Sequence, residues 1–251
     1  MRRLLIMLAA MAVALAPHGA AHAYPIKDKR LTHNRLYKSG PLPQRACAEK
    51  PVRPRDHRLV RAYLYGVFDC LNATWSAHLK KAGFAFRKPV LKVTNKGPRR
   101  WCGVDFRKQT SYYCDEKRTI LVVLNKDLLA DPTDLYLFAL LADRYGQHVQ
   151  NLVGIYRAYE DHDYRNKKEE REQARRYELQ SLCFSTAFLK STWRSLDRSA
   201  RDWRILLSYM KEWQDATVGT AANITHWAKR GFAKGDPGAC NTWAAPSGRV
   251  A

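Results

Sequence analysis

The sequence predicts an α+β domain that is predominantly helical, with a small sheet and several core helices. After residue 55, apolar residues recur at alternating spacings of three and four over several long segments, which indicates amphipathic helices. Two short segments, 89–94 and 119–125, are apolar and β-branched enough to form strands. Of the 251 residues, 228 follow a predicted leader of 23, and this length suffices for one domain with a sizeable core.

The first 23 residues have the pattern of a secretory signal peptide. Met1-Arg2-Arg3 is positively charged, and the apolar run over 4–16 has 13 residues, too few to span a bilayer. Ala21-His22-Ala23 supplies a small-x-small cleavage pattern. We therefore expect cleavage near Ala23 and a secreted, extracellular product, with no membrane span in the later sequence.

The chain is strongly basic, with 44 Lys and Arg against 23 Asp and Glu. The formal charge of +21 falls to +19 when Arg2 and Arg3 leave with the signal peptide. Such a charge favours association with extracellular polyanions such as wall polymers or acidic polysaccharide, or it is dispersed and serves solubility. No motif for sequence-specific nucleic-acid recognition is visible.

Six cysteines follow the leader, at positions 47, 70, 102, 114, 183 and 240. An even number in an exported chain indicates disulfides, and six cysteines allow 15 connectivities. None of them are spaced as C-x-x-C, so we do not expect the cysteines to bind zinc.

The first half of the chain combines an arm, a helix and the strands. Residues 24–54 are rich in proline and lack periodicity, so we expect an extended N-terminal arm. Residues 55–82 have helical spacing, and Gly83 is placed to end that helix. The two strand segments named above follow, and the segment 102–114 between them is expected to be a hairpin or loop.

The next helix organises the rest of the chain. Asp131-Pro132-Thr133-Asp134 offers a candidate N-cap, a proline at the first helical position and an early carboxylate. Asp143 and Gln147, spaced i, i+4, lie opposite the apolar stripe of this helix. The stripe consists of Leu135, Phe138, Ala142, Tyr145, Val149, Leu152 and Tyr156.

Three more helices are predicted after it. The charged segment 161–172 has mixed signs that predict a solvated helix face, and its helix continues to Trp193. Helices over 198–214 and 217–232 follow. The Ala, Pro, Ser and Gly-rich tail over 244–251 is expected to be flexible.

Several segments match the motifs of one family. Tyr145 to Gly154 resembles the H-E-x-x-H-H-x-Q motif and following apolar helix of the bacterial neutral zinc metallopeptidase family. Tyr177 to Cys183 is similar to its E-L-Q-A-D-C segment, and Gly231 to Cys240 to its G-F-x-x-G-D-P-x-x-C segment. Trp101-Cys102-Gly103 and Tyr112-Tyr113-Cys114 resemble its C-G and Y-C pair. The resemblance covers about Cys47 to Trp243 and implies one zincin-like domain over 55–243.

The resemblance also shows that the zinc motif is degenerate here. Asp143 and Gln147 stand at the two positions of the ligand histidines, and Arg144 stands at that of the general-base glutamate. Glu178 matches the third ligand, whereas Leu182 replaces a supporting aspartate. We therefore expect no catalytic residue and no bound metal at these positions.

The remaining candidates are cleft residues and disulfides. His148, Glu178 and Leu182 are the candidate cleft residues. We interpret His148 as structural or cleft-lining, because the family has a histidine beside its second ligand. The resemblance favours the disulfides Cys102–Cys114 and Cys183–Cys240, which leaves Cys47–Cys70. Two partners are open for Glu178: Arg144, turned into the vacated site, or a helix neighbour such as Arg175.

The sequence supports three hypotheses for the function. The leading hypothesis is a secreted, inactive relative of the peptidases that keeps its scaffold as a binding module. An extended peptide would then pair with the strand 119–125, which the resemblance places along the cleft. The alternative is an active secreted metallopeptidase that binds zinc through non-standard ligands. The third is a basic protein that binds extracellular polyanions or the cell wall.

Overall fold

The computed structural model describes residues 25–107, 109–130 and 133–251. The predicted signal peptide over 1–23 and the expected helix start at Asp131 and Pro132 lie outside these residues. The elements before the central helix are α1 Lys29–Thr32, η1 Arg35–Lys38, α2 His57–Lys81, β1 Val90–Thr94, β2 Arg100–Trp101, β3 Val104–Asp105, β4 Ser111–Cys114, β5 Thr119–Val123 and α3 Lys126–Ala130. The later ones are α4 Asp134–Leu152, α5 Ile155–Glu160, α6 Lys167–Thr192, η2 Trp193–Ser195, α7 Ala200–Lys211, α8 Ala221–Lys234, η3 Pro237–Cys240 and η4 Ser247–Arg249.

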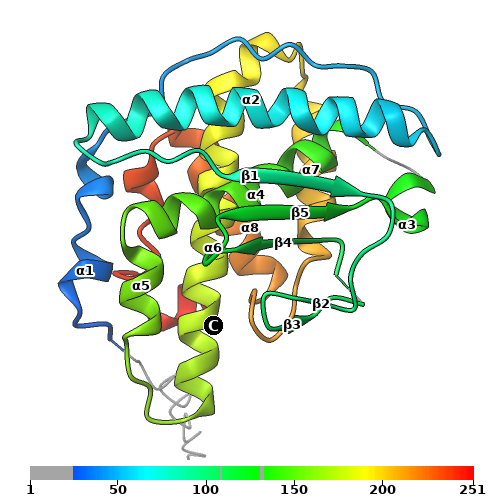
Figure 1. Cartoon of the computed structure of the whole chain (residues 1–251). Helices are drawn as coiled ribbons and strands as arrows, with labels where there is room; N and C mark the ends of the chain where they lie inside the picture. Colours follow the sequence, from blue (N-terminus) through cyan, green and yellow to red (C-terminus); the bar gives the residue numbers. More distant parts are fainter. Residues whose placement is uncertain (1–24, 108, 131–132) are drawn as a thin grey trace, which may run out of the picture.

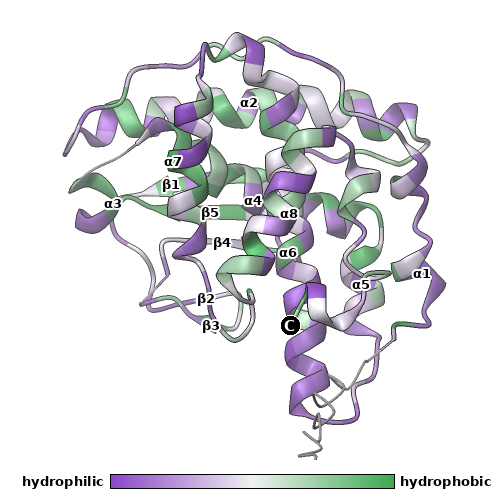
Figure 2. Ribbon diagram, turned by 180° about the vertical axis from the view of Figure 1, so that it is seen from behind, coloured by the Kyte–Doolittle hydropathy of each residue, from purple (hydrophilic) through white to green (hydrophobic). Residues whose placement is uncertain are grey.

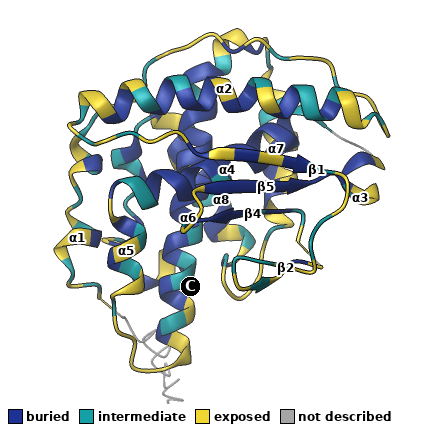
Figure 3. Cartoon of the chain, in the orientation of Figure 1, coloured by how far each residue is buried: buried dark blue, intermediate teal, exposed yellow. Residues whose placement is uncertain are grey.

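The expected fold class is confirmed, since helices dominate around a small mixed sheet (Figure 1). Helix α2 matches the predicted segment 55–82. Asp56 caps it by accepting a hydrogen bond from the Leu59 N–H at 2.9 Å, and Gly83 follows its end with φ +76°. Figure 3 shows α2 running along the β1 side of the sheet with its buried residues turned inward.

The main sheet has the strand order β1-β5-β4. Strand β1 is parallel to β5 and β4 is antiparallel to it. All residues of β5 are buried (Figure 3). The expectation that the strand 119–125 borders the cleft and pairs with a peptide is therefore wrong. Both sides of β5 are already hydrogen-bonded, and in the described part of the chain the two outer edges of this sheet belong to β1 and β4.

Helices α4, α6 and α8 pack closely behind the sheet (Figures 1 and 2). Glycines make these approaches possible. A Cβ on Gly146 of α4 would lie 2.8 Å from the backbone oxygen of Ser181 on α6. A Cβ on Gly231 of α8 would lie 2.3 Å from the backbone oxygen of Cys183. Because neither glycine has a Cβ, α4 and α8 can approach α6 more closely than any other residue would allow at these two positions.

The boundaries of α4 differ from the prediction. Its N-cap is Thr133, whose hydroxyl accepts a hydrogen bond from the Tyr136 N–H at 3.3 Å. The helix ends at Leu152, because Gly154 adopts φ +80° and separates it from α5. The predicted apolar stripe to Tyr156 thus belongs to two helices rather than one.

The expectation of a flexible tail over 244–251 is wrong. Val250 is 0% exposed, and the Trp227 indole donates a hydrogen bond to the Arg249 carbonyl oxygen at 2.8 Å. The Arg175 Nε also donates to the Val250 carbonyl oxygen at 2.6 Å. Composition alone predicted disorder, whereas buried contacts with α6 and α8 hold the segment in place.

The charged start of α6 is also less solvated than predicted. Figure 2 shows its first turns as hydrophilic, yet Glu172 is 3% exposed. Glu172 forms an i, i+4 pair with Arg176 at 2.7 Å, and Arg176 donates to backbone carbonyls of the C-terminal segment. A buried charge pair needs such additional partners, which the sequence pattern did not reveal.

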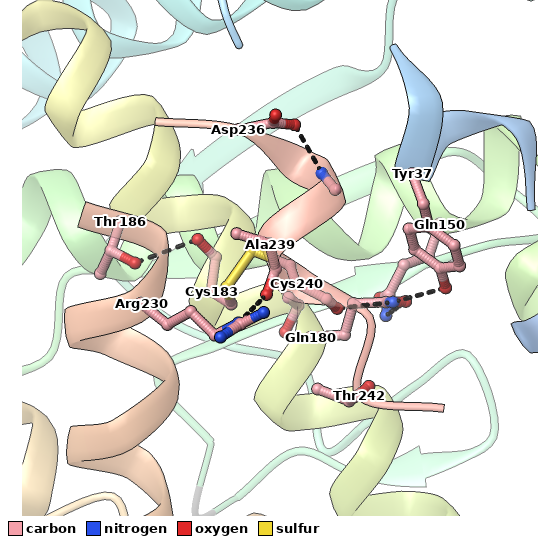
Figure 4. Close-up of a disulfide and its surroundings, with 12 residues drawn as sticks. Tyr37, Gln150, Gln180, Cys183, Thr186, Arg230, Asp236, Ala239, Cys240 and Thr242 are labelled. Atoms are coloured by element: carbon pink, nitrogen blue, oxygen red, sulfur yellow. Dashed lines mark hydrogen bonds between the residues drawn. A yellow bond between two sulfur atoms is a disulfide. The ribbon is translucent and has the colours of Figure 1, made fainter. Parts of the chain in front are cut away.

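Three disulfides fix the fold, Cys47–Cys70, Cys102–Cys114 and Cys183–Cys240. Cys102–Cys114 and Cys183–Cys240 are the pairs that the resemblance favours, and Cys47–Cys70 is the pair that they leave. Figure 4 shows Cys183 on α6 joined to Cys240, while the Gln180 side chain donates to the Cys240 carbonyl oxygen at 3.0 Å. The segment 25–54 runs over the surface, anchored by the fully buried Leu31 and Leu36. No helix in the described residues is long and apolar enough to cross a membrane.

Candidate functional site

The degenerate motif faces α6 across the close contact at Gly146. Asp143 and Gln147 occupy one side of α4 because they are one helical turn apart. Glu178 on α6 meets them there. The Gln147 Nε2 lies 3.2 Å from each carboxylate oxygen of Glu178 and donates hydrogen bonds to them. The structure thus brings together the positions that the resemblance assigns to a second and a third metal ligand.

Asp143, at the first ligand position, is satisfied by a serine. It is 4% exposed, and its Oδ1 lies 2.7 Å from the Ser181 hydroxyl. The same hydroxyl lies 2.9 Å from the Glu178 carbonyl oxygen. A hydroxyl has one proton, and an ionised carboxylate is the stronger acceptor, so Ser181 donates to Asp143 whenever Asp143 is charged.

Arg144 lies between the two carboxylates. Its Nη2 is 3.4 Å from Asp143 Oδ2, and its Nη1 is 3.9 Å from Glu178 Oε2. Its Nε donates to the Ser111 hydroxyl at 3.3 Å, which ties the side chain to the edge strand β4. The second distance is that of an ion pair without a direct hydrogen bond. The Arg144 side chain is 25% exposed, so it lies at the outer side of the site.

Of the two partners considered for Glu178, Arg144 is the one found. Arg175 points elsewhere, because its Nε and Nη1 donate to the carbonyl oxygens of Val250 and Ala216, at 2.6 and 3.1 Å. The expected helix neighbour therefore serves the C-terminal segment. Glu178 is held by the Gln147 amide and by the Arg144 charge.

The electrostatics of the site follow from burial. Burial raises the pKa of Glu178 to about 7, with Arg144 opposing the shift and Asp143 adding to it. Burial likewise raises the pKa of Asp143, against Arg144 and Ser181. Burial acts to lower the pKa of Arg144, but the two carboxylates outweigh it and raise that pKa. Arg144 is thus a permanent cation beside two carboxyls that ionise reluctantly.

His148 belongs to a different network. Its Nε2 lies 2.8 Å from the Arg87 carbonyl oxygen, which can only accept, so Nε2 carries the proton. Its Nδ1 then accepts from the Tyr113 hydroxyl at 2.9 Å, and that hydroxyl accepts from the Asn151 amide. His148 is fully buried, and burial lowers its pKa to about 4. It is a neutral side chain that joins α4 to β4 and to the segment before β1.

Leu182, at the position of the supporting aspartate, is buried in the hydrophobic core. Gln150, which matches the last residue of the family motif, is buried on the α6 side of α4. Its Nε2 donates to Gln180 Oε1 at 3.0 Å and to the Tyr177 carbonyl oxygen at 2.9 Å (Figure 4). Both residues therefore serve packing between helices.

These residues do not fit a zinc ion. The described residues hold no group of three or more His, Cys, Asp or Glu that could bind a metal. At this site two carboxylates converge, but the Arg144 guanidinium lies within 4 Å of each of them. At about 4 Å, repulsion between a guanidinium and a dication amounts to several kcal/mol even at an effective dielectric constant of about 20. The Gln147 amide is a poor ligand in place of an imidazole.

Two residues of the site carried no functional prediction from the sequence. Ser181 satisfies Asp143, and Ser111 anchors Arg144. Ser181 follows Glu178 by three positions, so helical spacing alone places both on one face of α6. The position of Ser111 depends on the register of β4 against β5, which the sequence does not encode locally.

The fold and the site together define a class of protein. A helix presents an i, i+4 pair to a carboxylate on a later helix, beside the free edge of a small sheet. This is a zincin-like metallopeptidase scaffold with altered ligand positions. A family model described as "Putative neutral zinc metallopeptidase" matches residues 38–199, and the chain belongs to that family.

Curated relatives are similar over most of the chain. The uncharacterized protein YpfJ of Escherichia coli strain K12 is 27% identical over 196 residues, which cover 68% of this chain and 67% of the relative. The YpfJ protein of Escherichia coli O6:H1 shows the same identity and coverage. No solved structure matches the chain.

Proposed function

We propose that this protein is an exported, non-catalytic member of the neutral zinc metallopeptidase family whose cleft serves as a binding surface. One observation carries the proposal: Arg144 stands at the general-base position and lies 3.4 and 3.9 Å from the carboxylates of Asp143 and Glu178. A guanidinium cannot accept a proton at physiological pH, so it cannot activate water as a base. It also supplies positive charge where the family would hold a metal ion.

The outer edge of β4, beside the former metal site, offers an extended peptide a place to bind. Strand β4 has an unpaired edge in the described structure, and its first residue, Ser111, contacts Arg144. A peptide that added to this edge would form main-chain hydrogen bonds and pass beside the former metal site. In this proposal, β4 takes the role that the sequence assigned to β5.

Metal content and proteolysis test the loss of activity. The mature protein, purified from the culture medium without chelators, is expected to contain far less than one zinc per chain and to leave casein intact. A family member with an intact H-E-x-x-H motif, purified in the same way, is the positive control. Stoichiometric zinc together with chelator-sensitive casein cleavage would establish the alternative, an active metallopeptidase with non-standard ligands.

Export is tested separately. The pattern in residues 1–23 and three disulfides support it. N-terminal sequencing of protein from the medium is expected to begin at Tyr24. Retention in the cell with an intact Met1 would contradict it.

A second candidate function rests on the sheet face that carries β2 and β3. The Nζ atoms of Lys117 and Lys92 lie 4.7 and 5.6 Å from the ring centroid of Trp101, so two ammonium groups gather over one aromatic ring. This arrangement favours an anionic polymer with flat groups or a sugar backbone. Replacing Lys92 and Lys117 by Gln is expected to lower the salt concentration that elutes the protein from heparin. The matched control replaces Lys27 and Lys211 by Gln. An equal decrease of the eluting salt concentration in both variants would mean that heparin binds through dispersed charge and not at this face.

A further inference from the structure

A cavity lies at the N-terminal end of α4, away from the degenerate motif. Its volume is about 450 Å³, and it is formed by α3, by the first turn of α4 and by the end of α7. Figure 2 shows α7 and α3 on the same side of the molecule. The cavity is large enough for an amino-acid side chain with its flanking backbone.

Three aromatic rings wall this cavity. Tyr136 on α4 lies 6.0 Å from Tyr209 and 6.0 Å from Trp213, between ring centroids, with interplanar angles of 67° and 70°. The rings therefore meet edge to face and do not stack flat on one another. Tyr209 is 37% exposed, so its ring is accessible from solvent. Such rings offer π faces with negative potential to a cation.

Two carboxylates line the same cavity, Asp127 on α3 and Glu212 at the end of α7. Within the described ranges neither forms an ion pair. Both carboxylates therefore face a cavity with aromatic walls, in a chain where Lys and Arg outnumber Asp and Glu by 44 to 23.

We propose that this pocket binds an alkylammonium group, presented as a lysine side chain by another molecule. The aromatic rings would surround the aliphatic stem and the ammonium, and Asp127 and Glu212 would neutralise the charge. The strong positive charge of the rest of the surface repels cations, so specific binding here depends on the local carboxylates. The proposal is independent of the state of the zinc motif, since it uses none of the residues at that site.

Nuclear magnetic resonance titration of the mature protein with intact disulfides tests it. The probe is Nα-acetyl-lysine N-methylamide, and its neutral analogue is Nα-acetyl-norleucine N-methylamide. The indole N–H of Trp213, assigned with Trp213→Phe, reports binding. We expect a saturable shift for the lysine probe and an affinity at least about threefold higher than for the norleucine probe.

Variants locate the effect. Glu212→Gln and Tyr209→Ala are each expected to weaken lysine binding by about threefold or more. Both positions are exposed, so neither change is expected to unfold the protein, and thermal melting checks this. Glu116→Gln and Tyr65→Ala make the same changes at exposed positions that do not line the cavity. Equal affinity for the two probes, or an unchanged affinity in both pocket variants, overturns the proposal.

Discussion

Arg144 acts as an internal counter-ion for two carboxylates. If Arg144 is replaced by Met, Asp143 and Glu178 lose the charge that lowers their pKa values. We expect the free energy of unfolding to fall by about 1 to 3 kcal/mol at pH 8.5, since the pair is partly exposed and the distances are those of a loose ion pair. The loss is expected to be smaller at pH 5.5, where the carboxyls can take up protons. Urea unfolding at both pH values measures the difference. Arg157→Met, at an exposed guanidinium with a 3.8 Å pair, is the control.

Glu178 itself makes stability depend on pH. Its folded pKa of about 7 lies above its ordinary value of 4.5, so the folded state binds the proton more tightly than the unfolded chain. The stabilisation that protonated Glu178 contributes is fully present below pH 4.5, and it is lost as the pH rises through 7. We expect Glu178→Gln to remove this decline and to be relatively more stable at pH 8 than at pH 5. His148, with a lowered pKa, contributes a loss of stability on the acid side in both proteins, so the difference between them reports Glu178 together with its effect on Asp143. Parallel pH profiles would contradict the assignment.

The altered ligand positions can also be tested by restoration. Asp143→His, Arg144→Glu and Gln147→His together would place two imidazoles opposite Glu178, because Gln147 already reaches that carboxylate at 3.2 Å. We expect zinc affinity to rise at least about tenfold over the parent, measured by competition with a chromogenic chelator. Proteolytic activity is expected to lag behind binding, since Leu182 supplies no supporting carboxylate. A folded triple variant with unchanged zinc affinity would show that α4 is aligned wrongly with the metal site.

At the scale of elements, the contact between α4 and α6 depends on a missing side chain. Gly146→Ala would place a Cβ 2.8 Å from the Ser181 backbone oxygen and 3.0 Å from the Ser181 Cα. Both atoms belong to the backbone, so the helices would have to move apart to relieve the clash. We expect a loss of about 2 to 4 kcal/mol in the free energy of unfolding, because overpacking outweighs the helix propensity of alanine. The same substitution is expected to weaken the hydrogen bonds between Gln147 and Glu178.

Gly66 on α2 provides the matched control. A Cβ there would come no nearer than 4.0 Å to another atom, the Ala48 carbonyl oxygen. Gly66→Ala is therefore expected to stabilise the protein by about 0.5 to 1 kcal/mol through helix propensity alone. Denaturant midpoints of the two variants measure the contrast, and a similar small effect at both positions would mean that the helices are not in close contact at Gly146.

The helix boundaries show which signals are local. The end of α2 before Gly83 was predicted from that glycine, whereas the N-cap Asp56, one residue after the predicted start at 55, was not identified from the sequence. The break after α4 also has a local signal, because Gly154 adopts a left-handed conformation. The apolar spacing nevertheless continues past Gly154 to Tyr156, and this spacing alone predicts one uninterrupted helix. The apolar periodicity therefore predicted the buried face of α4 but not the turn at Gly154.

At the scale of the whole molecule, tertiary pairing decides what local patterns leave open. Apolar composition predicted the strand 119–125. Its central place in the sheet depends on pairing with the parallel strand β1, whose residues each lie 29 positions earlier in the chain than their partners on β5. Glu178 was predicted as a site residue, whereas its pairing with Arg144 rather than Arg175 depends on how α6 faces α4 and the C-terminal segment. The tail was misjudged for the same reason, since small residues and proline in a sequence do not show that another helix buries them.

The C-terminal segment is accordingly predicted to stabilise the whole fold. It lies beside α6 (Figures 1 and 2), where Ser247 donates to Glu172 at 2.9 Å and Arg176 donates to the Ala245 carbonyl oxygen at 2.8 Å. Val250→Ala removes two methyl groups from a fully buried position, so we expect a loss of about 1 to 2 kcal/mol.

Ending the chain after Ala244 is expected to cost considerably more, because Arg176 and Glu172 would lose partners while remaining buried. Urea unfolding compares both variants with Val90→Ala, the same chemical change at a side chain that is 50% exposed. A truncated chain as stable as the parent would mean that Arg176 and Glu172 do not depend on the C-terminal segment. Equal losses in the two valine variants would mean that Val250 is not buried in solution.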